Sequence, residues 1–323
     1  MSWRLEINHL TRYRYDRPVV ASYNEARLTP LSTPQQFVIE AQVAVRPAAQ
    51  LFCFTDYWGA LVHAFDVHSP HQSLLVTSRA IVETMPSAGP SAAPSAEPGT
   101  PHGTGPATGL AGGSDGERDE GDGSSPERPS NRPTGPVSWD DLVGAPVADR
   151  FYELLAPSRF VTPEDLADVA RELRACHSAP AAAVPAVLDW VHGQLEYGAG
   201  ATNVHTSAVE AWHAGQGVCQ DFAHLSLAVL RAMGIPARYV SGYFYPEAAG
   251  QIGAKVVGES HAWVEAWTGT WGAHDPTNLM QVGERHVLVA RGRDYADVTP
   301  VRGIYSGPPG SSTEVTVELV RRA

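Results

Sequence analysis

The sequence predicts an α+β fold in which a β-sandwich-like domain precedes helices packed on an antiparallel sheet. Short segments rich in aromatic and β-branched residues dominate residues 1–85. Segments with apolar residues at helical spacing follow within residues 139–233, and strand-like segments return after residue 238. A run rich in Pro, Gly, Ser and acidic residues separates the two parts, so residues 86–136 are expected to form a disordered linker.

The N-terminal domain is expected to hold short strands separated by turns, which is typical of a small sandwich. Cys53 lies between Phe52 and Phe54, and this apolar setting predicts a buried thiol. The strands are expected at Trp3–Ile7, Thr11–Tyr15, Phe37–Val45, Leu61–Val67 and Leu74–Glu83.

Helices are expected at the start of the second part, residues 137–305. Thr162 before Pro163 is a strong helix start, because a capping side chain precedes a proline that suits the first helical position. That helix should run to about Cys176, whose thiol is expected to be structural or exposed. Further helices are expected over Val184–Leu195 and over a short segment that begins at the capping residue Thr206.

A cysteine opens the helix around which the rest of the chain is organised. Cys219 follows Gly217, and the run from Cys219 to Met233 carries apolar residues at helical spacing. The helix should end at Gly234, which tolerates a positive φ, and Pro236 prevents its continuation. Cys219 therefore lies at a helix N-terminus, where free amides and the helix dipole stabilise a thiolate.

Two downstream segments supply groups that a nucleophilic cysteine needs. Ser260–Trp267 is typical of a strand, and Gly272–Asp275 is typical of the end of a second one. The segment between them has the length of a hairpin turn, so antiparallel pairing would bring His261 beside Asp275. A base to hold the thiol proton and a third group to orient that base complete the requirement.

Each of these residues also has an ordinary structural interpretation. Cys219 would otherwise be a core cysteine, and His261 a hydrogen-bonded sheet histidine. Asp275 before a proline is a common turn residue, and Asn278 is a weaker candidate for the orienting group. His224 lies at a helical offset that turns it away from the thiol.

The sequence resembles the transglutaminase-like superfamily over roughly residues 150 to 300. The resemblance is to the bacterial branch, whose members also carry an N-terminal β domain. It implies a papain-like core with a catalytic triad of Cys219, His261 and Asp275. The segments that carry it are Gly217–Leu225, Gly234–Tyr243, His261–Trp263 and Asp275–Asn278, with further likeness at Tyr13–Pro30 and Gly292–Gly303.

This resemblance implies attack of the thiolate on a peptide or side-chain amide and an acyl-thioester intermediate. Release by water would make the protein a peptidase or amidase, which we expect. Release by an amine would make it a protein-glutamine acyltransferase. A non-catalytic peptide-binding module is a third hypothesis, and in each case the partner is a peptide or protein.

The composition limits which classes of binding partner are expected. The 323 residues carry a formal net charge of −12 without a basic cluster, so neither nucleic acid nor an anionic membrane is expected. Cys53, Cys176 and Cys219 are few and odd in number, which suits a reducing compartment, and the N-terminus lacks the apolar segment of a signal peptide. A cytoplasmic protein is therefore expected.

No cofactor or metal is expected, because the paired spacings of structural zinc motifs are absent. The oligomeric state is left open. A C-terminal strand within residues 306–323 should pack against the N-terminal sheet and so join the two ends of the chain. Residues 246–258, which precede His261, contain several glycines and are expected to form a loop that acts as a lid or lip.

Overall fold

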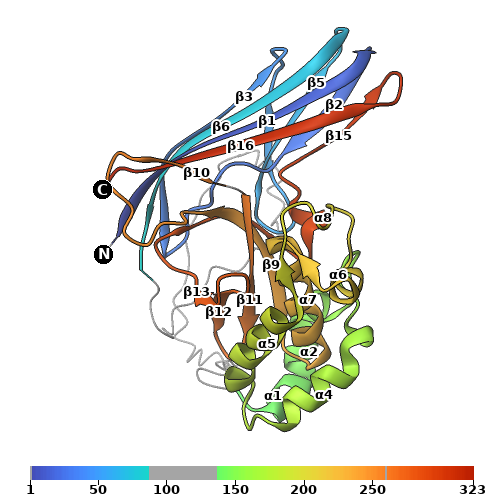
Figure 1. Cartoon of the computed structure of the whole chain (residues 1–323), viewed down its shortest axis with the longest axis vertical. Coiled ribbons are helices and arrows are strands. Elements are labelled where there is room, and N and C mark those ends of the chain that lie inside the picture. Colours follow the sequence, from blue (N-terminus) through green and yellow to red (C-terminus); the bar gives the residue numbers. More distant parts are fainter. Residues whose placement is uncertain (1, 87–136, 259) are drawn as a thin grey trace, which may run out of the picture.

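The computed structural model describes residues 2–86, 137–258 and 260–323. The expected linker spans residues 86–136. Only its first residue is among the described residues, and residues 87–136 lie outside them. Within the described part, three antiparallel sheets of four or five strands are joined to a group of helices (Figure 1). None of the described helices is long and apolar enough to cross a membrane.

The sheet that we call the N-terminal sheet contains strands from both ends of the chain. Its strand order is β10 (Lys255–Gly258), β16 (Ser311–Arg321), β1 (Trp3–Val19), β6 (His71–Thr84) and β3 (Gln36–Arg46). Its partner sheet has the order β15 (Val301–Ser306), β2 (Ala21–Ala26), β5 (Leu61–Val67) and β4 (Phe52–Thr55).

The N-terminal sheet and its partner sheet pack as the expected sandwich. Buried side chains from both sheets form one cluster between them, including Leu74 and Val76 of β6 and Phe65 of β5. This part of the fold prediction is confirmed. Cys53, expected to be buried, is exposed instead, because β4 is an edge strand that has both faces open to solvent.

The longest strand corrects two shorter expectations. The segments Trp3–Ile7 and Thr11–Tyr15 belong to one strand, β1. The chain does not turn at Asn8 between them, because β1 pairs without interruption with β16 from Leu5 to Tyr15. The expected pairing of the C-terminal strand with the N-terminal sheet is thereby confirmed. Residues 246–258 are not a loop throughout, since their last four form β10.

The third sheet, which we call the core sheet, supports the helices. Its strand order is β13 (Met280–Gln281), β12 (Trp271–Asp275), β11 (Ser260–Trp267), β9 (Ala237–Phe244) and β14 (His286–Gly292). The short strands β7 (Glu196–Tyr197) and β8 (Gln216–Gly217) form a separate parallel pair. The helices are α1 (Trp139–Val143), α2 (Ala145–Arg150), α3 (Tyr152–Leu155), the 3₁₀ helix η1 (Pro163–Leu166), α4 (Ala167–Ala175), α5 (Pro180–Gln194), α6 (Ala208–Ala214), α7 (Cys219–Ala232) and α8 (Tyr295–Val298).

Several helices begin elsewhere than the sequence suggested. Thr162 does not cap α4, because the residues after it form η1 first. The second expected helix, α5, starts at Pro180, four residues before the expected start, since that proline suits the first helical position. For α6 the cap is Ser207, not Thr206, because Ser207 forms a capping box with Glu210.

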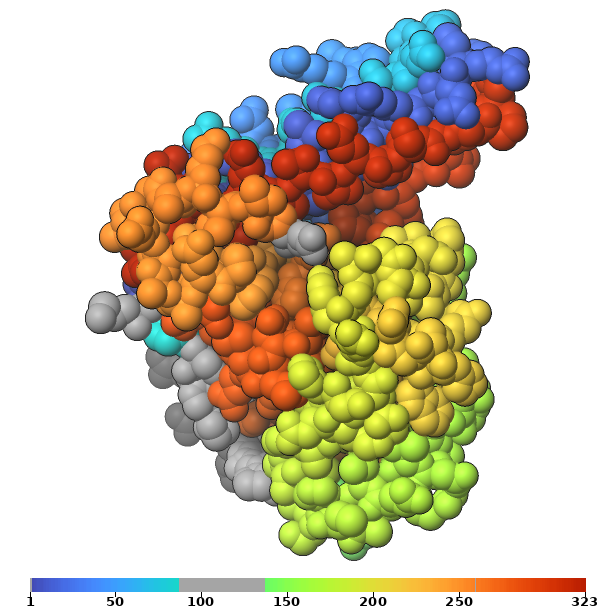
Figure 2. Space-filling model, viewed as in Figure 1, coloured from blue at the N-terminus to red at the C-terminus, as the bar shows by residue number. Residues whose placement is uncertain are grey.

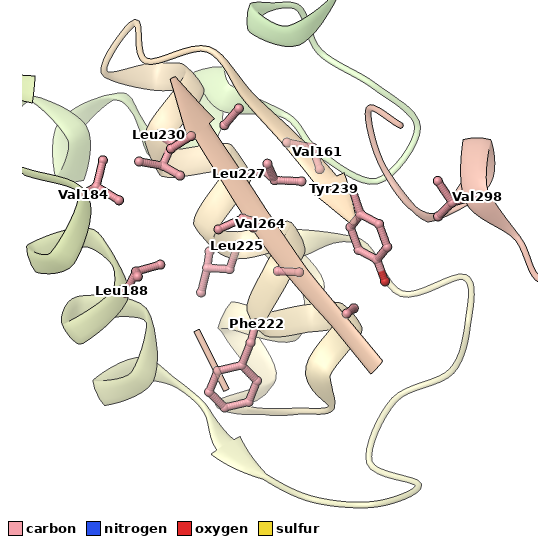
Figure 3. Close-up of a cluster of buried hydrophobic side chains, with 14 of the residues drawn as sticks. Val161, Val184, Leu188, Phe222, Leu225, Leu227, Leu230, Tyr239, Val264 and Val298 are labelled. Atoms are coloured by element: carbon pink, nitrogen blue, oxygen red, sulfur yellow. The ribbon is translucent and has the colours of Figure 1, made fainter. Parts of the chain in front are cut away.

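Helix α7 is the centre of the helical part. Every residue from Gln220 to Arg231 is buried, because α7 packs against β11, α5, α6 and η1. Polar residues of α7 are buried along with the apolar ones, among them Asp221, His224 and Arg231. It ends as expected at Gly234, whose φ is 84°. Figure 3 shows the side chains grouped between these elements, including Leu225, Leu227, Leu230, Val264, Val184 and Leu188.

The N-terminal sheet shares the main hydrophobic core with the helical part. Leu5 and Ile7 of β1 and Leu319 of β16 belong to the same buried cluster as Leu227 of α7. A polar contact crosses the same boundary, where His9 lies 2.9 Å from the hydroxyl of Tyr243. The N-terminal sheet is therefore fixed above the core sheet, as Figure 1 shows.

Candidate active site

Cys219 is the first residue of α7, and a short buried network fixes the turn before it. The Asp221 carboxylate accepts the N–H of Val218 at 2.8 Å and the hydroxyl of Thr202 at 2.6 Å. Gly217 leaves room for this carboxylate, because a Cβ there would lie 2.7 Å from the Cβ of Asp221. Asp221 therefore fixes the turn that leads into the helix start.

The Cys219 thiol lies against the beginning of β11. Its Sγ is 3.9 Å from the carbonyl oxygen of Ser260. The next residue, His261, has its Nε2 2.7 Å from Asp275 Oδ2, and interaction with Cys219 contributes to the raised pKa of the imidazole. The structure thus brings together Cys219, His261 and Asp275, the residues that the sequence singled out.

Burial alone would lower the pKa of His261, but hydrogen bonds with Asp275 and Cys219 outweigh it. They raise the pKa of His261 to about 10. A protonated imidazole beside a thiol favours the thiolate, since opposite charges at short range stabilise each other. The arrangement therefore suits a thiolate–imidazolium pair.

The Asp275 carboxylate is buried and accepts several hydrogen bonds. Its Oδ1 accepts the N–H groups of Thr277 at 2.9 Å and Asn278 at 3.1 Å. Its Oδ2 also accepts the Asn278 side-chain amide at 2.8 Å. Burial raises the pKa of Asp275, yet the hydrogen bonds from His261 and His286 lower it well below its usual range. Asp275 therefore stays ionised.

His286 completes this set, and nothing in the sequence distinguished it from the other histidines. It begins β14, and its Nε2 lies 3.2 Å from Asp275 Oδ2. Its Nδ1 accepts the N–H of Gly283 at 3.3 Å, so the ring proton must be on Nε2. Burial lowers the pKa of His286, which keeps the ring neutral. His286 thus donates to Asp275 as a neutral imidazole.

Aromatic rings enclose the two histidines. The ring of Phe244 lies 5.1 Å from that of His261 and 4.7 Å from that of His286. Trp263 packs edge-on against His286 at 5.3 Å. Gly242 makes this packing possible, because a Cβ there would lie 2.5 Å from Trp263. The rings shield the His261–Asp275 hydrogen bond from water.

His261, Asp275 and His286 also offer ligand atoms within 4.8 Å of one another, which is close enough to hold a metal ion. The hydrogen bonds account for the cluster in another way. The Nε2 proton of His286 points to Asp275, and the same carboxylate oxygen is shared with His261. The possible ligand atoms are thus hydrogen-bonded to one another, and we assign no metal ion to them.

Other candidate residues have structural contacts. His224, expected to face away from the thiol, is buried and accepts the N–H of Tyr295 at 3.2 Å. The Asn278 side-chain nitrogen lies 3.5 Å from His261 Nε2, so Asn278 contacts the imidazole as well as the carboxylate. Tyr239 of β9 is buried, and this burial is the main cause that raises its pKa.

The molecular surface has a groove on one face. Figure 2 shows it between the orange surface, which includes β10 and β11, and the yellow surface around α6. The red and blue strands of the N-terminal sheet project above it. A partly buried thiol and imidazole with a buried carboxylate form a site suited to nucleophilic thiol chemistry.

Comparisons with known proteins agree with this architecture. A family model for the bacterial transglutaminase-like N-terminal region matches residues 5–83, and a model for the transglutaminase-like superfamily matches residues 167–276. An uncharacterized protein of Mycobacterium leprae is 40% identical over 323 residues, which cover 99% of this chain and 100% of that protein. An uncharacterized protein of Mycobacterium tuberculosis is 32% identical over 332 residues, with 98% and 92% covered.

A solved structure from Cytophaga hutchinsonii, described as a candidate cysteine protease, has the same fold. It covers 99% of this chain and 91% of its own, with a TM-score of 0.69 and 22% identity. The chain belongs to the transglutaminase-like superfamily and carries the N-terminal region found in its bacterial members. The family expected from the sequence is confirmed.

Proposed function

We propose that this protein is a cysteine peptidase or amidase that acts through Cys219, His261 and Asp275. The observation that carries the proposal is the geometry at the start of β11, where the Cys219 sulfur lies 3.9 Å from the Ser260 carbonyl and His261 Nε2 lies 2.7 Å from Asp275 Oδ2. The same three groups in this order activate a thiol for attack on carbonyl carbon.

The proposed reaction begins with attack of the Cys219 thiolate on the carbonyl carbon of a peptide or side-chain amide. The carbonyl oxygen takes the negative charge, and the backbone N–H of Cys219 in the first turn of α7 is a candidate donor to it. As the C–N bond breaks, the His261 imidazolium protonates the departing nitrogen. An amine leaves and an acyl-thioester remains on Cys219.

The second half-reaction releases the acyl group. Neutral His261 removes a proton from water, the hydroxide oxygen bonds to the thioester carbon, and the Cys219 sulfur leaves as a thiolate. The net result is hydrolysis, with an acid and an amine as products. Asp275 holds the imidazole in one orientation through both halves and stabilises its charge.

Transfer to an amine is the second candidate function, because the same acyl-thioester accepts an amine in place of water. Cys219 is partly exposed, so water can reach its sulfur, and this favours hydrolysis. A cytoplasmic location is still a prediction from the sequence.

The test uses β-casein, an unstructured protein that offers peptide bonds, glutamines and lysines. Release of acid-soluble peptides or ammonia reports hydrolysis, and incorporation of dansylcadaverine reports transfer. We expect hydrolysis that disappears in Cys219→Ala and falls at least a hundredfold in His261→Ala. If binding of β-casein persists while both activities are absent from the wild type, the protein is a binding module and not an enzyme.

A further inference from the structure

One strand edge of the N-terminal sheet is unpaired next to the candidate active site. On that edge β10 covers β16 only from Val320 to Val317, where Gly258 pairs with Val317. The remaining part of β16, Ser311–Thr316, has β1 on one side and, among the described residues, no strand on the other. We call Ser311–Thr316 the free edge. All six of its residues are exposed.

The hydrogen-bond pattern tells which backbone groups of the free edge point outward. The N–H of Arg322 donates to Arg4 of β1, whereas the carbonyl of Arg321 accepts the N–H of Gly253 on the opposite side. Antiparallel strands alternate in this way at each residue. The N–H and C=O groups at odd-numbered positions, Ser311, Thr313 and Val315, therefore face away from β1.

The free edge lacks the features that normally prevent strand addition. Exposed edges are usually interrupted by lysine, proline or a bulge. Ser311–Thr316 contains neither residue, and its pairing with β1 continues without a shift in register. The charge of Glu314 is compensated by Arg12 at 3.4 Å and Arg14 at 3.6 Å. An added strand would meet an intact, neutralised edge.

One end of the free edge lies close to the candidate active site. The strand β10 ends at Gly258, and β11 begins at Ser260, whose carbonyl lies 3.9 Å from the Cys219 sulfur. The free edge continues from Val317, the partner of Gly258, so its first residue, Thr316, lies beside the start of the site. At about 3.3 Å per residue it offers roughly 20 Å of pairing length.

We propose that an extended segment of the polypeptide substrate binds by adding a strand to the free edge of β16. This inference rests on the proposed function. Addition antiparallel to β16, as for β10, puts the N-terminal end of the segment next to Ser260 and Cys219. The free edge therefore binds the substrate residues that follow the reacting carbonyl, and main-chain hydrogen bonds supply the affinity.

Hydrogen exchange tests the contact directly. The Cys219→Ala protein is mixed with saturating β-casein, and exchange is followed by mass spectrometry in peptides that cover residues 311–316. We expect slower exchange at the outward amides of Thr313 and Val315. The opposite edge of the same sheet is the internal control. The same alternation along β3 makes the amide of Ala41 point outward. The exchange of such outward amides on β3 should not change when β-casein is added.

A matched pair of variants provides the functional readout. Thr313→Pro removes one outward donor and no bond to β1, and prolines are tolerated in edge strands at such positions. Loss of one such hydrogen bond should lower kcat/KM for β-casein about threefold to tenfold. Ala41→Pro makes the same change on the β3 edge and should leave kcat/KM unchanged.

The outcomes separate this proposal from the proposed function. Protection of the free edge without turnover by the wild type would support the binding site and reject the enzyme. Turnover with neither protection nor an effect of Thr313→Pro would reject the binding site alone. Protection already present without β-casein, rising with protein concentration and lost in Thr313→Pro, would assign the edge to a second copy of the chain and also reject it. Absence of both turnover and protection would reject both proposals.

Discussion

At the scale of single residues, the Asp275 carboxylate determines how the site behaves. It accepts hydrogen bonds from backbone and side-chain donors, including His261 and His286, and its pKa falls well below the usual range. A carboxylate that cannot take the proton leaves it on His261, so the imidazole carries the charge that stabilises a thiolate. Asp275 thus contacts the His261 imidazole and also favours its protonated form.

The first prediction concerns Asp275→Asn and pH. The folded-state pKa of Asp275 is lowered, so its stabilisation is present above about pH 4 and is lost on acidification. The pKa of His261 is raised to about 10, so its stabilisation is complete below about pH 6.5 and is lost as pH rises through 10. The free energy of unfolding of the wild type should therefore be about 3 kcal/mol higher than that of Asp275→Asn near pH 5.5. At pH 10 this difference should be smaller.

Urea unfolding at pH 5.5, 8 and 10 measures this difference. Asn278→Ala serves as a control, because it removes a neutral donor and no charge. A difference between wild type and Asp275→Asn that is constant over this range would contradict the assigned ion pair.

The second prediction concerns His286, which acts through Asp275 and is a positioning residue. His286→Phe removes the Nε2–H donor at 3.2 Å and leaves a buried carboxylate oxygen with one partner fewer. We expect kcat on β-casein to fall about tenfold with KM unchanged. His286→Gln retains an amide donor and should recover part of kcat. Equal losses in both variants would indicate a packing role only.

The sequence singled out Cys219, His261 and Asp275 because each has a local signal. A helix start marks Cys219, a strand marks His261, and a turn marks Asp275. His286 has no such signal. Its role depends on β14 pairing with β9 across the core sheet, and no local pattern in the chain reports a contact of that kind.

At the scale of elements, the start of α7 decides where the sulfur lies. Val218 is the N-cap residue but has no polar side chain, so Asp221 supplies the acceptor for its N–H from within the first turn. The same carboxylate accepts the hydroxyl of Thr202 and so joins the preceding loop to the helix. The turn and the helix are therefore fixed together.

The third prediction follows for Asp221→Ala. Loss of both hydrogen bonds should destabilise the protein by about 1–2 kcal/mol, as for a helix cap. Because the helix start would fray, alkylation of Cys219 should also lose its dependence on His261. Unfolding in urea and the rate of iodoacetamide labelling measure the two effects. Asp221→Asn retains an acceptor, so its stability and its labelling rate should lie between those of Asp221→Ala and wild type. If Asp221→Ala has the same stability and labelling rate as wild type, the network has no role in positioning Cys219.

Element boundaries were the least accurate part of the sequence reading. The strand β11 was predicted to its exact ends, and a short turn at residues 268–270 follows it. The start of α6 was displaced by one residue, since Thr206 and Ser207 are both good caps and only Ser207 has Glu210 three residues later. Two neighbouring residues that are both good N-caps can be told apart only when the side chain three residues later, which completes the capping box, is considered as well.

At the scale of the whole molecule, a single hydrophobic cluster links the N-terminal sheet to the helices. Ile7 of β1 and Leu227 of α7 are both members of it and are at most 1% exposed. The β16 strand completes the N-terminal sheet with residues from the end of the chain. The sheet and the helical part should therefore unfold together.

The fourth prediction tests this cooperativity. Ile7→Ala and Leu227→Ala should each lower the free energy of unfolding by about 2–5 kcal/mol in one shared transition. Tryptophan fluorescence and circular dichroism should report the same midpoint in each variant. Val315→Ala, at an exposed position on β16, is the control and should change stability by less than about 0.5 kcal/mol. Two separate transitions would contradict the shared core.

The fold class was predictable at this scale, but the details of assembly were not. Alternating residues in the C-terminal segment indicated a strand, and its pairing with the N-terminal sheet was expected. The addition of β10 to the same sheet was not, because Lys255–Gly258 has no strong strand pattern and is held by pairing with β16. Long-range pairing thus created the free edge that the sequence did not reveal.

The central claim is that His261 activates the Cys219 thiol. The measurement is the pH dependence of alkylation at each cysteine, followed by mass spectrometry in wild type and His261→Ala, with the exposed Cys53 and Cys176 as internal references. We predict that Cys219 reacts well below pH 8 in the wild type and loses this reactivity in His261→Ala. If Cys219 reacts with the same pH dependence as the two exposed cysteines and is indifferent to His261, the claim is wrong.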